Sequence, residues 1–205
     1  MDIHTVALMF LRWIHITAGI IWIGHLYFFN FVNLPFGKTM DAATKKSVVP
    51  QLMPRALWWF RWGAMITFLS GVIYMYWKYW VLGSGMTGES GLMSSVPGQW
   101  ITLGALFGTI MWFNVWFVIW PRQKKIIGWV KGGQAPAEMA GMMKTAALAS
   151  KINTYLSMPL LFAMGAAPHF PVINPAWILG VIVGGFAVVW HLYKISAKTG
   201  ANFGA

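Results

Sequence analysis

The sequence predicts an all-α integral membrane protein, a bundle of about five transmembrane helices in a single membrane domain covering residues 1–205. Three observations lead to this class. Hydrophobic residues make up 58% of the chain and charged residues only 9%, whereas soluble proteins carry roughly a quarter charged residues. Five apolar runs reach the ~20 residues that a bilayer core requires. These runs are continuously apolar and do not alternate over about ten residues, so they indicate helices and not barrel strands.

The five predicted spans cover about residues 5–32, 57–82, 99–120, 146–167 and 175–196. The first starts near an N-terminus that has neither a basic stretch nor an A-x-A cleavage site, so we expect an uncleaved span and not a removable signal. The third ends at Pro121, which we expect to stop the helix. Within residues 122–145 we expect a short interfacial helix after Pro136. The Gly/Ser-rich loop between the second and third spans has no assignable chemistry.

The placement of the basic residues predicts the orientation of the bundle. The segments after the first and third spans and the C-terminal segment, with the adjoining ends of the spans, contain 13 of the 15 lysines and arginines. The loops on the opposite side contain Glu89 and no basic residue, and the two other basic residues, Arg12 and Lys78, lie within spans. The positive-inside rule therefore places the N-terminus outside and the C-terminus in the cytoplasm. We expect a multi-pass protein of a bacterial inner membrane.

Charge and composition also exclude several kinds of chemistry. The net charge of +11 follows the membrane topology and forms no basic arm, so we expect the lipid bilayer, and no nucleic acid, as a partner. Without cysteine, the chain has no disulfide, no thiolate metal site and no C-x-x-C-H attachment for a c-type haem. The histidine spacing includes no H-x-H or H-x-x-x-H, which disfavours zinc or copper. All four acidic residues lie outside the spans, so paired-carboxylate chemistry has no basis.

Depth along the spans divides the histidines into two groups. His15 and His169 belong to the outer half, with His4 at the outer edge, whereas His25 and His191 belong to the inner half. His25 lies ten residues beyond His15, which is about 15 Å along a helix. Two imidazoles from different helices are the axial ligands of a six-coordinate b-type haem, and neutral imidazole brings no buried charge. The histidines therefore predict iron ligands for one such haem, or for two.

Small and basic residues accompany these histidines. Gly19 lies on the same helical face as His15, and Gly184 belongs to a stripe in which Gly180, Gly184, Ala187 and His191 share one face of the fifth span. Small residues of this kind let a porphyrin approach the backbone. Arg12, one turn outward from His15, is positioned to pair with a haem propionate or another anionic ligand.

Structural interpretations of the same residues stay open. Gly180-x-x-x-Gly184 is also a common helix-packing motif, and Arg12 could extend its guanidinium to the outer interface. Intramembrane histidines also hydrogen-bond across helices or lie at the lipid head groups.

Three phrases resemble the membrane domain of the PuuD-type urate hydroxylases, the urate oxidase N-terminal domain family. They are "LRWIHITAGIIWIGHLYFFNF", "PRALWWFRWGAMITFLSG" and "SKINTYLSMPLLFAMGAAPHF". The resemblance covers the first, second and fourth spans well and the third and fifth weakly. It implies haem-linked redox chemistry and a haem or redox role for His15 and His169. The first phrase also resembles the histidine-bearing helix of small haem-associated membrane proteins of the HemJ type.

In full-length family members a cytochrome c domain follows the membrane part. Its cysteine-attached haem has no counterpart in this cysteine-free chain, so we expect a separate electron acceptor. We therefore expect a b-type haem-binding membrane subunit that carries electrons with other membrane redox subunits. One alternative is a membrane-bound urate or purine hydroxylase that uses a separate cytochrome c. The other is a non-catalytic accessory subunit.

Overall fold

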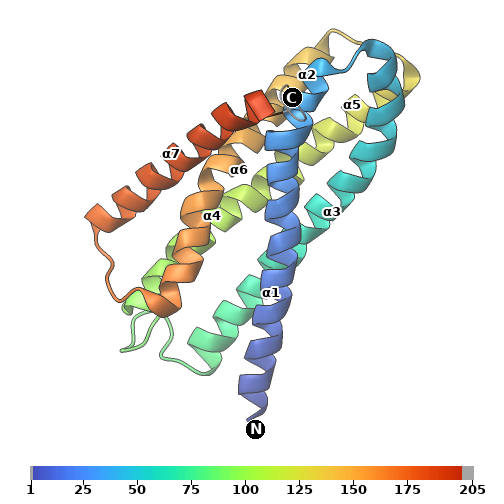
Figure 1. The fold of residues 1–205 in the computed structure, drawn as a ribbon. Helices are drawn as coiled ribbons and strands as arrows, with labels where there is room; N and C mark the ends of the chain where they lie inside the picture. Colours follow the sequence, from blue (N-terminus) through green and yellow to red (C-terminus); the bar gives the residue numbers. More distant parts are fainter. Residues whose placement is uncertain (1, 200–205) are drawn as a thin grey trace.

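The computed structural model describes residues 2–199, which form a bundle of long helices with no strand among them (Figure 1). Three helices contain a π-helical segment, a wider turn often found near functional sites. In chain order the elements are α1 (Ile3–Tyr27), η1 (Phe28–Asn33), α2 (Leu34–Thr39), α3 (Ala42–Tyr76), η2 (Trp77–Val81), α4 (Val96–Phe113), η3 (Asn114–Ile119), α5 (Trp120–Gly132), α6 (Glu138–His169) and α7 (Pro175–Thr199). The predicted all-α class is confirmed.

Four continuous helices are long and apolar enough to cross a membrane: Ile3–Thr39, Ala42–Val81, Val96–Gly132 and Pro175–Thr199. They match the first, second, third and fifth predicted spans. The fourth, residues 146–167, lies within α6, which has 32 residues but a more polar sequence. Length and composition thus indicate a multi-pass membrane protein.

The structure differs from the sequence interpretation around Pro121 and Pro136. Pro121 does not stop the helix, because it lies at the start of α5, directly after the π-helical turns of η3. Pro121 cannot donate a backbone hydrogen bond. The helix continues through it directly after the wider π-helical turns of η3, where the regular hydrogen-bond pattern is already interrupted. After Pro136 the chain forms the long helix α6 and no separate short helix.

The bundle is built from two closely packed helix pairs, α1 with α3 and α4 with α6, while α7 packs on α6. The backbones of α1 and α3 approach closely at Gly63, where a Cβ atom would lie 3.1 Å from the backbone nitrogen of Trp22. Trp22, Leu26 and Phe60 are buried together with Met111 of α4 in the main apolar cluster. Small residues at the seam, as in membrane helix packing generally, allow this contact.

The helix α6 joins the two pairs through polar side chains buried at membrane depth. Asn153, with none of its surface exposed, donates to the carbonyl of Met111 at 2.9 Å and accepts from the Asn114 amide at 2.8 Å. One turn earlier in α6, the Asn30 amide of η1 donates to the Ser150 hydroxyl at 2.8 Å. These polar side chains of α6 therefore have hydrogen-bond partners inside the bundle, where an unpaired polar group would be costly.

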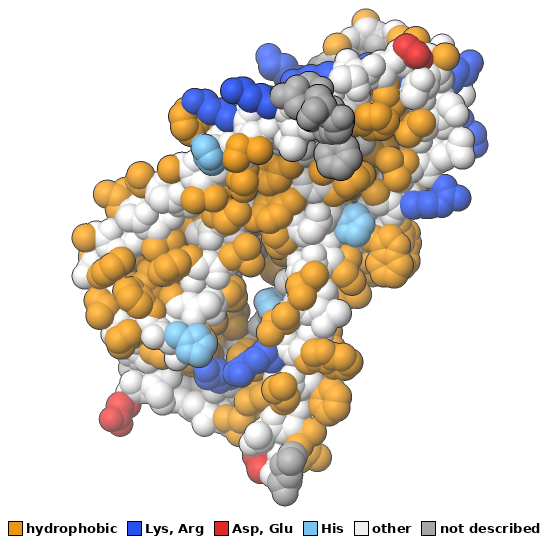
Figure 2. Space-filling view, viewed as in Figure 1, with side chains coloured by type: hydrophobic (Ala, Val, Ile, Leu, Met, Phe, Trp, Pro, Cys, Tyr) orange, Lys and Arg blue, Asp and Glu red, His pale blue; other side chains and the backbone are white. Residues whose placement is uncertain are grey.

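Lysine and arginine side chains gather mainly at one end of the molecule, which we call the basic end (Figure 2). This end contains α2, the start of α3 and α5 (Figure 1). The opposite end contains the start of α1 and the loop between η2 and α4. The segregation of charge follows the pattern on which the predicted orientation rests.

Asp41 caps the N-terminus of α3 and provides a test of helix capping. Its carboxylate accepts a 2.7 Å hydrogen bond from the backbone N–H of Thr44, and this bond lowers the pKa of Asp41 from its ordinary value. Because the folded-state pKa is the lower one, the charged cap stabilises the fold above the unfolded pKa of about 4. That contribution is lost as the pH falls through the folded value.

We therefore expect Asp41→Ala to lower the thermal midpoint in detergent at neutral pH, with a difference from wild type that shrinks as the pH falls below about 4. The asparagine of Asp41→Asn also caps helices but does not titrate, so the thermal midpoint of this variant should stay close to that of the wild type at neutral pH. A difference between Asp41→Ala and wild type that is constant down to acid pH would contradict this interpretation.

Candidate functional site

His15 is held between α1 and α3 by a hydrogen bond that leaves one ring nitrogen free. Its Nδ1 lies 2.8 Å from the carbonyl oxygen of Thr67, and the ring is half-buried. Because a carbonyl oxygen can only accept, Nδ1 carries the hydrogen, and in the neutral ring the lone pair is on Nε2. No described residue hydrogen-bonds to Nε2. This is the tautomer that a histidine needs to ligate a metal through Nε2.

A glycine of α3 makes room for the His15 ring. A Cβ atom on Gly71 would lie 2.9 Å from Cε1 and 3.1 Å from Nδ1 of His15. A Cβ on Gly19, in contrast, would meet only the Thr67 side chain, at 3.9 Å. Gly19, which the sequence places beside His15, thus packs against the α3 seam, and Gly71 is the glycine that the imidazole requires.

Arg12 lies one turn beyond His15, away from the basic end. Its guanidinium donates a 2.6 Å hydrogen bond to the hydroxyl of Tyr74 and lies 5.5 Å from the centre of that ring. No acidic side chain within residues 2–199 pairs with Arg12, and the residue is exposed. The tyrosine directs the guanidinium along α3 and leaves its other N–H groups available for an anion.

The α3 residues that support this site were missed in the sequence. Thr67, Ser70, Gly71 and Tyr74 follow one another at i, i+3, i+4 and i+7, so they share one face of the helix. Ser70 adds a longer contact, with its hydroxyl 3.4 Å from Nδ1 of His15. In the sequence, the regular spacing of these small and hydroxyl residues within an apolar run was the feature that could have indicated a helix face packed against His15.

The space-filling view shows a hollow in the half of the molecule away from the basic end, between α1 and the α4–α6 pair (Figure 2). Histidine and basic side chains border it. The described hydrogen bonds between α1–η1 and α6 begin at Tyr27, whose hydroxyl lies 2.9 Å from that of Ser157. The two helix pairs are thus joined by hydrogen bonds toward the basic end. Beyond them, the pairs meet through aromatic contact, with the Phe68 ring of α3 stacked on Trp112 of α4 at 4.3 Å.

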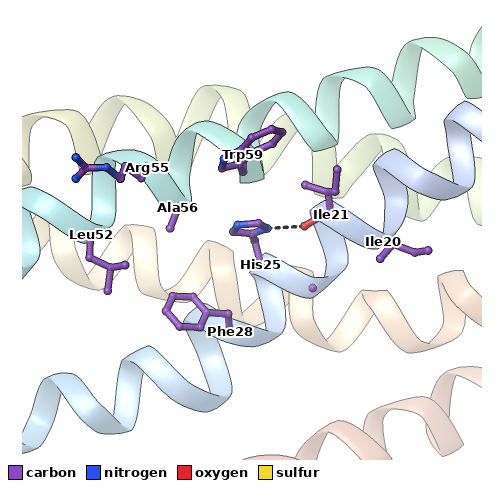
Figure 3. Close-up of a pocket in the computed structure, with 9 residues that line it drawn as sticks. Ile20, Ile21, His25, Phe28, Leu52, Arg55, Ala56 and Trp59 are labelled. Atoms are coloured by element: carbon purple, nitrogen blue, oxygen red, sulfur yellow. Dashed lines mark hydrogen bonds between the residues drawn. The ribbon is translucent and has the colours of Figure 1, made fainter.

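His25 lies on a different part of the α1–α3 seam. Its Nδ1 is 2.7 Å from the carbonyl oxygen of Ile21, one turn earlier in the same helix. The ring borders a surface groove of about 480 Å³ that also includes Arg55 and Trp59 of α3 (Figure 3). Like His15, His25 therefore has an Nε2 without a partner in the described chain.

The remaining predicted residues lie on exposed surfaces. His169 ends α6, and His191 lies in the last third of α7; neither makes a hydrogen bond within residues 2–199. Gly184 faces away from the protein, with no atom within 4 Å of a Cβ placed there, whereas Gly185 packs on Pro159. The structure thus brings neither exposed histidine into bonded contact with α1, and the pairings His15–His169 and His25–His191 stay predictions.

His4 is engaged differently from the other histidines. The indole N–H of Trp77 donates to its Nδ1 at 3.2 Å, so in the neutral ring Nε2 carries the hydrogen. No group of three or more metal-binding side chains forms in the part of the chain that the structure describes. The zinc or copper alternative thus gains no support there.

Fold and site together define a class: a multi-pass helical membrane protein with an intramembrane histidine whose Nε2 is free. A family model described as urate oxidase N-terminal matches residues 90–203. That is more than half of the chain, and the chain belongs to this family, as predicted. Of the three phrases, only "SKINTYLSMPLLFAMGAAPHF" lies within the matched residues, and the first two spans lie outside them. The match covers α4 to α7, with His169 and His191, but not Arg12 or His15. No match was found among curated proteins or among solved structures.

Proposed function

We propose that the chain is a b-type haem-binding membrane subunit in which Nε2 of His15 ligates the haem iron. The observation that carries this proposal is the 2.8 Å hydrogen bond from Nδ1 of His15 to the Thr67 carbonyl. A backbone acceptor on the second nitrogen fixes the tautomer and the direction of the ring, as it does for most metal-binding histidines. When bound, haem b supplies a one-electron carrier.

The surroundings of His15 fit such a group. Gly71 permits close packing of the imidazole against α3, and the neutral ring avoids burying a charge at membrane depth. Arg12 provides N–H groups for a propionate one helical turn away. His169 is the proposed second ligand on this side, and a second haem at His25 and His191 stays a prediction.

Electron transfer by this chain requires partners, because the chain has no cysteine and hence no c-type haem of its own. Other membrane redox subunits or a separate cytochrome c are the proposed partners, in the inner membrane of a bacterium. The pyridine haemochrome spectrum of the purified, folded chain tests the proposal. We expect a haem b spectrum; a colourless, fully folded protein would overturn it and favour an accessory structural subunit.

A second candidate function is urate or purine hydroxylation with a separate cytochrome c as acceptor. Membership in the urate oxidase N-terminal family favours it, and so does the unpaired guanidinium of Arg12 beside His15, because urate is an anion. The test is urate-dependent reduction of added cytochrome c by the purified chain. Reduction that disappears in Arg12→Gln would support it, and absence of turnover with a competent acceptor would exclude it.

A further inference from the structure

The groove beside His25 differs from the His15 site in both position and lining. Its volume is about 480 Å³, and it is wide open to the surface. Apart from His25 and Arg55, its walls are apolar, and its edge residues Ile20 and Trp59 are 69% and 51% exposed. In a membrane-spanning helix pair, an exposed apolar groove faces lipid. A ligand therefore reaches it laterally from the bilayer.

The His25 ring presents a hydrogen-bond acceptor to this groove. Because Nδ1 donates to the Ile21 carbonyl at 2.7 Å, the lone pair of the neutral ring is on Nε2. Figure 3 shows the imidazole pointing from α1 toward Ala56 and Trp59 of α3. The acyl chains of surrounding lipids have no donor for this atom, and an unpaired polar group in hydrocarbon is costly. The site is therefore complementary to a ligand that carries a donor.

Aromatic side chains shape the same space for a flat ring. Trp59 and Phe28 lie on opposite sides of the imidazole in Figure 3, one from α3 and one from η1. Gly24 opens the floor, since no atom lies within 4 Å of a Cβ placed there. Aromatic pairs gain energy from stacked or edge-to-face contact beyond simple burial. The groove thus favours a planar ring over a flexible chain.

From this combination we propose that the groove binds the ring of a membrane quinol, with a ring hydroxyl donating to Nε2 of His25 and the isoprenoid tail in the bilayer. A phospholipid tail would make apolar contacts with the walls of the groove but would offer no hydrogen-bond donor to Nε2 of His25. A bis-histidine haem would need a second imidazole, and the lining contains no other histidine. Arg55, at the end of the groove nearest the basic end, offers a donor to the far ring oxygen. This inference does not depend on the haem proposed at His15, and it is an alternative to a second haem at His25 and His191.

The test uses the full chain in phosphatidylcholine nanodiscs with an azido-benzoquinol photoprobe kept in its reduced form, mapped by mass spectrometry. We expect labelling of peptides from residues 20–28 and 52–59. A short-tailed benzoquinol should displace the probe about tenfold better than its dimethyl ether, which keeps the ring but has no donor, because one hydrogen bond is lost. Equal displacement by the two compounds would overturn the proposal.

Two variants distinguish binding of quinol in the groove from its general partitioning into the bilayer. Gly24→Leu adds a side chain to the floor of the groove, where a Cβ atom has no neighbour within 4 Å, and it should weaken displacement at least about tenfold. Gly180→Leu, at an equally open glycine of α7, should not. His25→Phe keeps an aromatic ring and should abolish the preference for quinol over its ether. Better displacement by phosphatidylglycerol than by quinol would contradict the inference. So would loss of haem absorbance in His25→Phe, which would assign the groove to haem.

Discussion

Gly71→Val should weaken haem b binding by about 10- to 100-fold, the usual cost of disturbing a residue that orients a metal ligand. A Cβ atom at this position would lie 2.9 Å from Cε1 and 3.1 Å from Nδ1 of His15. The imidazole must then move away from α3, and its hydrogen bond to Thr67 lengthens or breaks. The substitution thus changes the position of the His15 imidazole and leaves the histidine itself in place.

The matched control is Gly19→Ala, because its Cβ would make only an ordinary contact of 3.9 Å with Thr67. Haem titration of both apo variants, followed at the Soret band, gives the comparison. The ligand field provides a second readout: in Gly71→Val the remaining haem should shift toward high spin. Equal affinities and unchanged spectra for the two variants would contradict the proposed role of Gly71.

Asn153→Leu should lower the free energy of unfolding by about 2 kcal/mol, since it leaves buried groups without partners. The leucine is similar in size, but the Asn114 amide loses its acceptor and the Met111 carbonyl loses a donor. These groups lie where α4 passes into η3, inside the bundle, where water does not replace the lost bonds. Denaturation in mixed detergent micelles measures the loss.

The double variant Asn114→Leu/Asn153→Leu tests the physical reason. Removing both polar partners costs less than orphaning one of them, so the double variant should be more stable than Asn153→Leu alone. Measured hydrogen bonds between membrane helices contribute about 0.6 kcal/mol on average and about 1.7 kcal/mol at most. Additive losses in the double variant would mean that the two side chains do not act as a pair.

The sequence was sufficient for the fold class but not for the central helix. Continuous apolar runs placed four of the helices, because lipid imposes a length and a composition that can be counted. The helix α6 is long enough to span a bilayer but more polar than those four helices. Its Asn153 and Ser150 form hydrogen bonds to other helices and do not face lipid. The extension through Pro121 could not be predicted, because it depends on the local π-helical turns of η3.

The candidate site was predictable on α1 and not on α3. His15 and Arg12 are rare residue types at membrane depth, and such residues mark functional sites by their cost alone. Thr67 and Gly71 are common in membrane helices and acquire a role only through the way in which α1 crosses α3. For the same reason, helical periodicity predicted Gly184 as the glycine of the fifth span that allows the close approach of a haem or a helix, whereas in the structure its neighbour Gly185 packs on Pro159.

The central claim, ligation by Nε2 of His15, is tested most directly by His15→Gly with and without added imidazole. The glycine leaves a space beside Gly71 and Thr67 that a free imidazole can enter. Our account predicts that the variant purifies without the low-spin haem b spectrum of the wild type and regains it when imidazole is added. A low-spin spectrum that is unchanged in His15→Gly, without imidazole, would contradict the account.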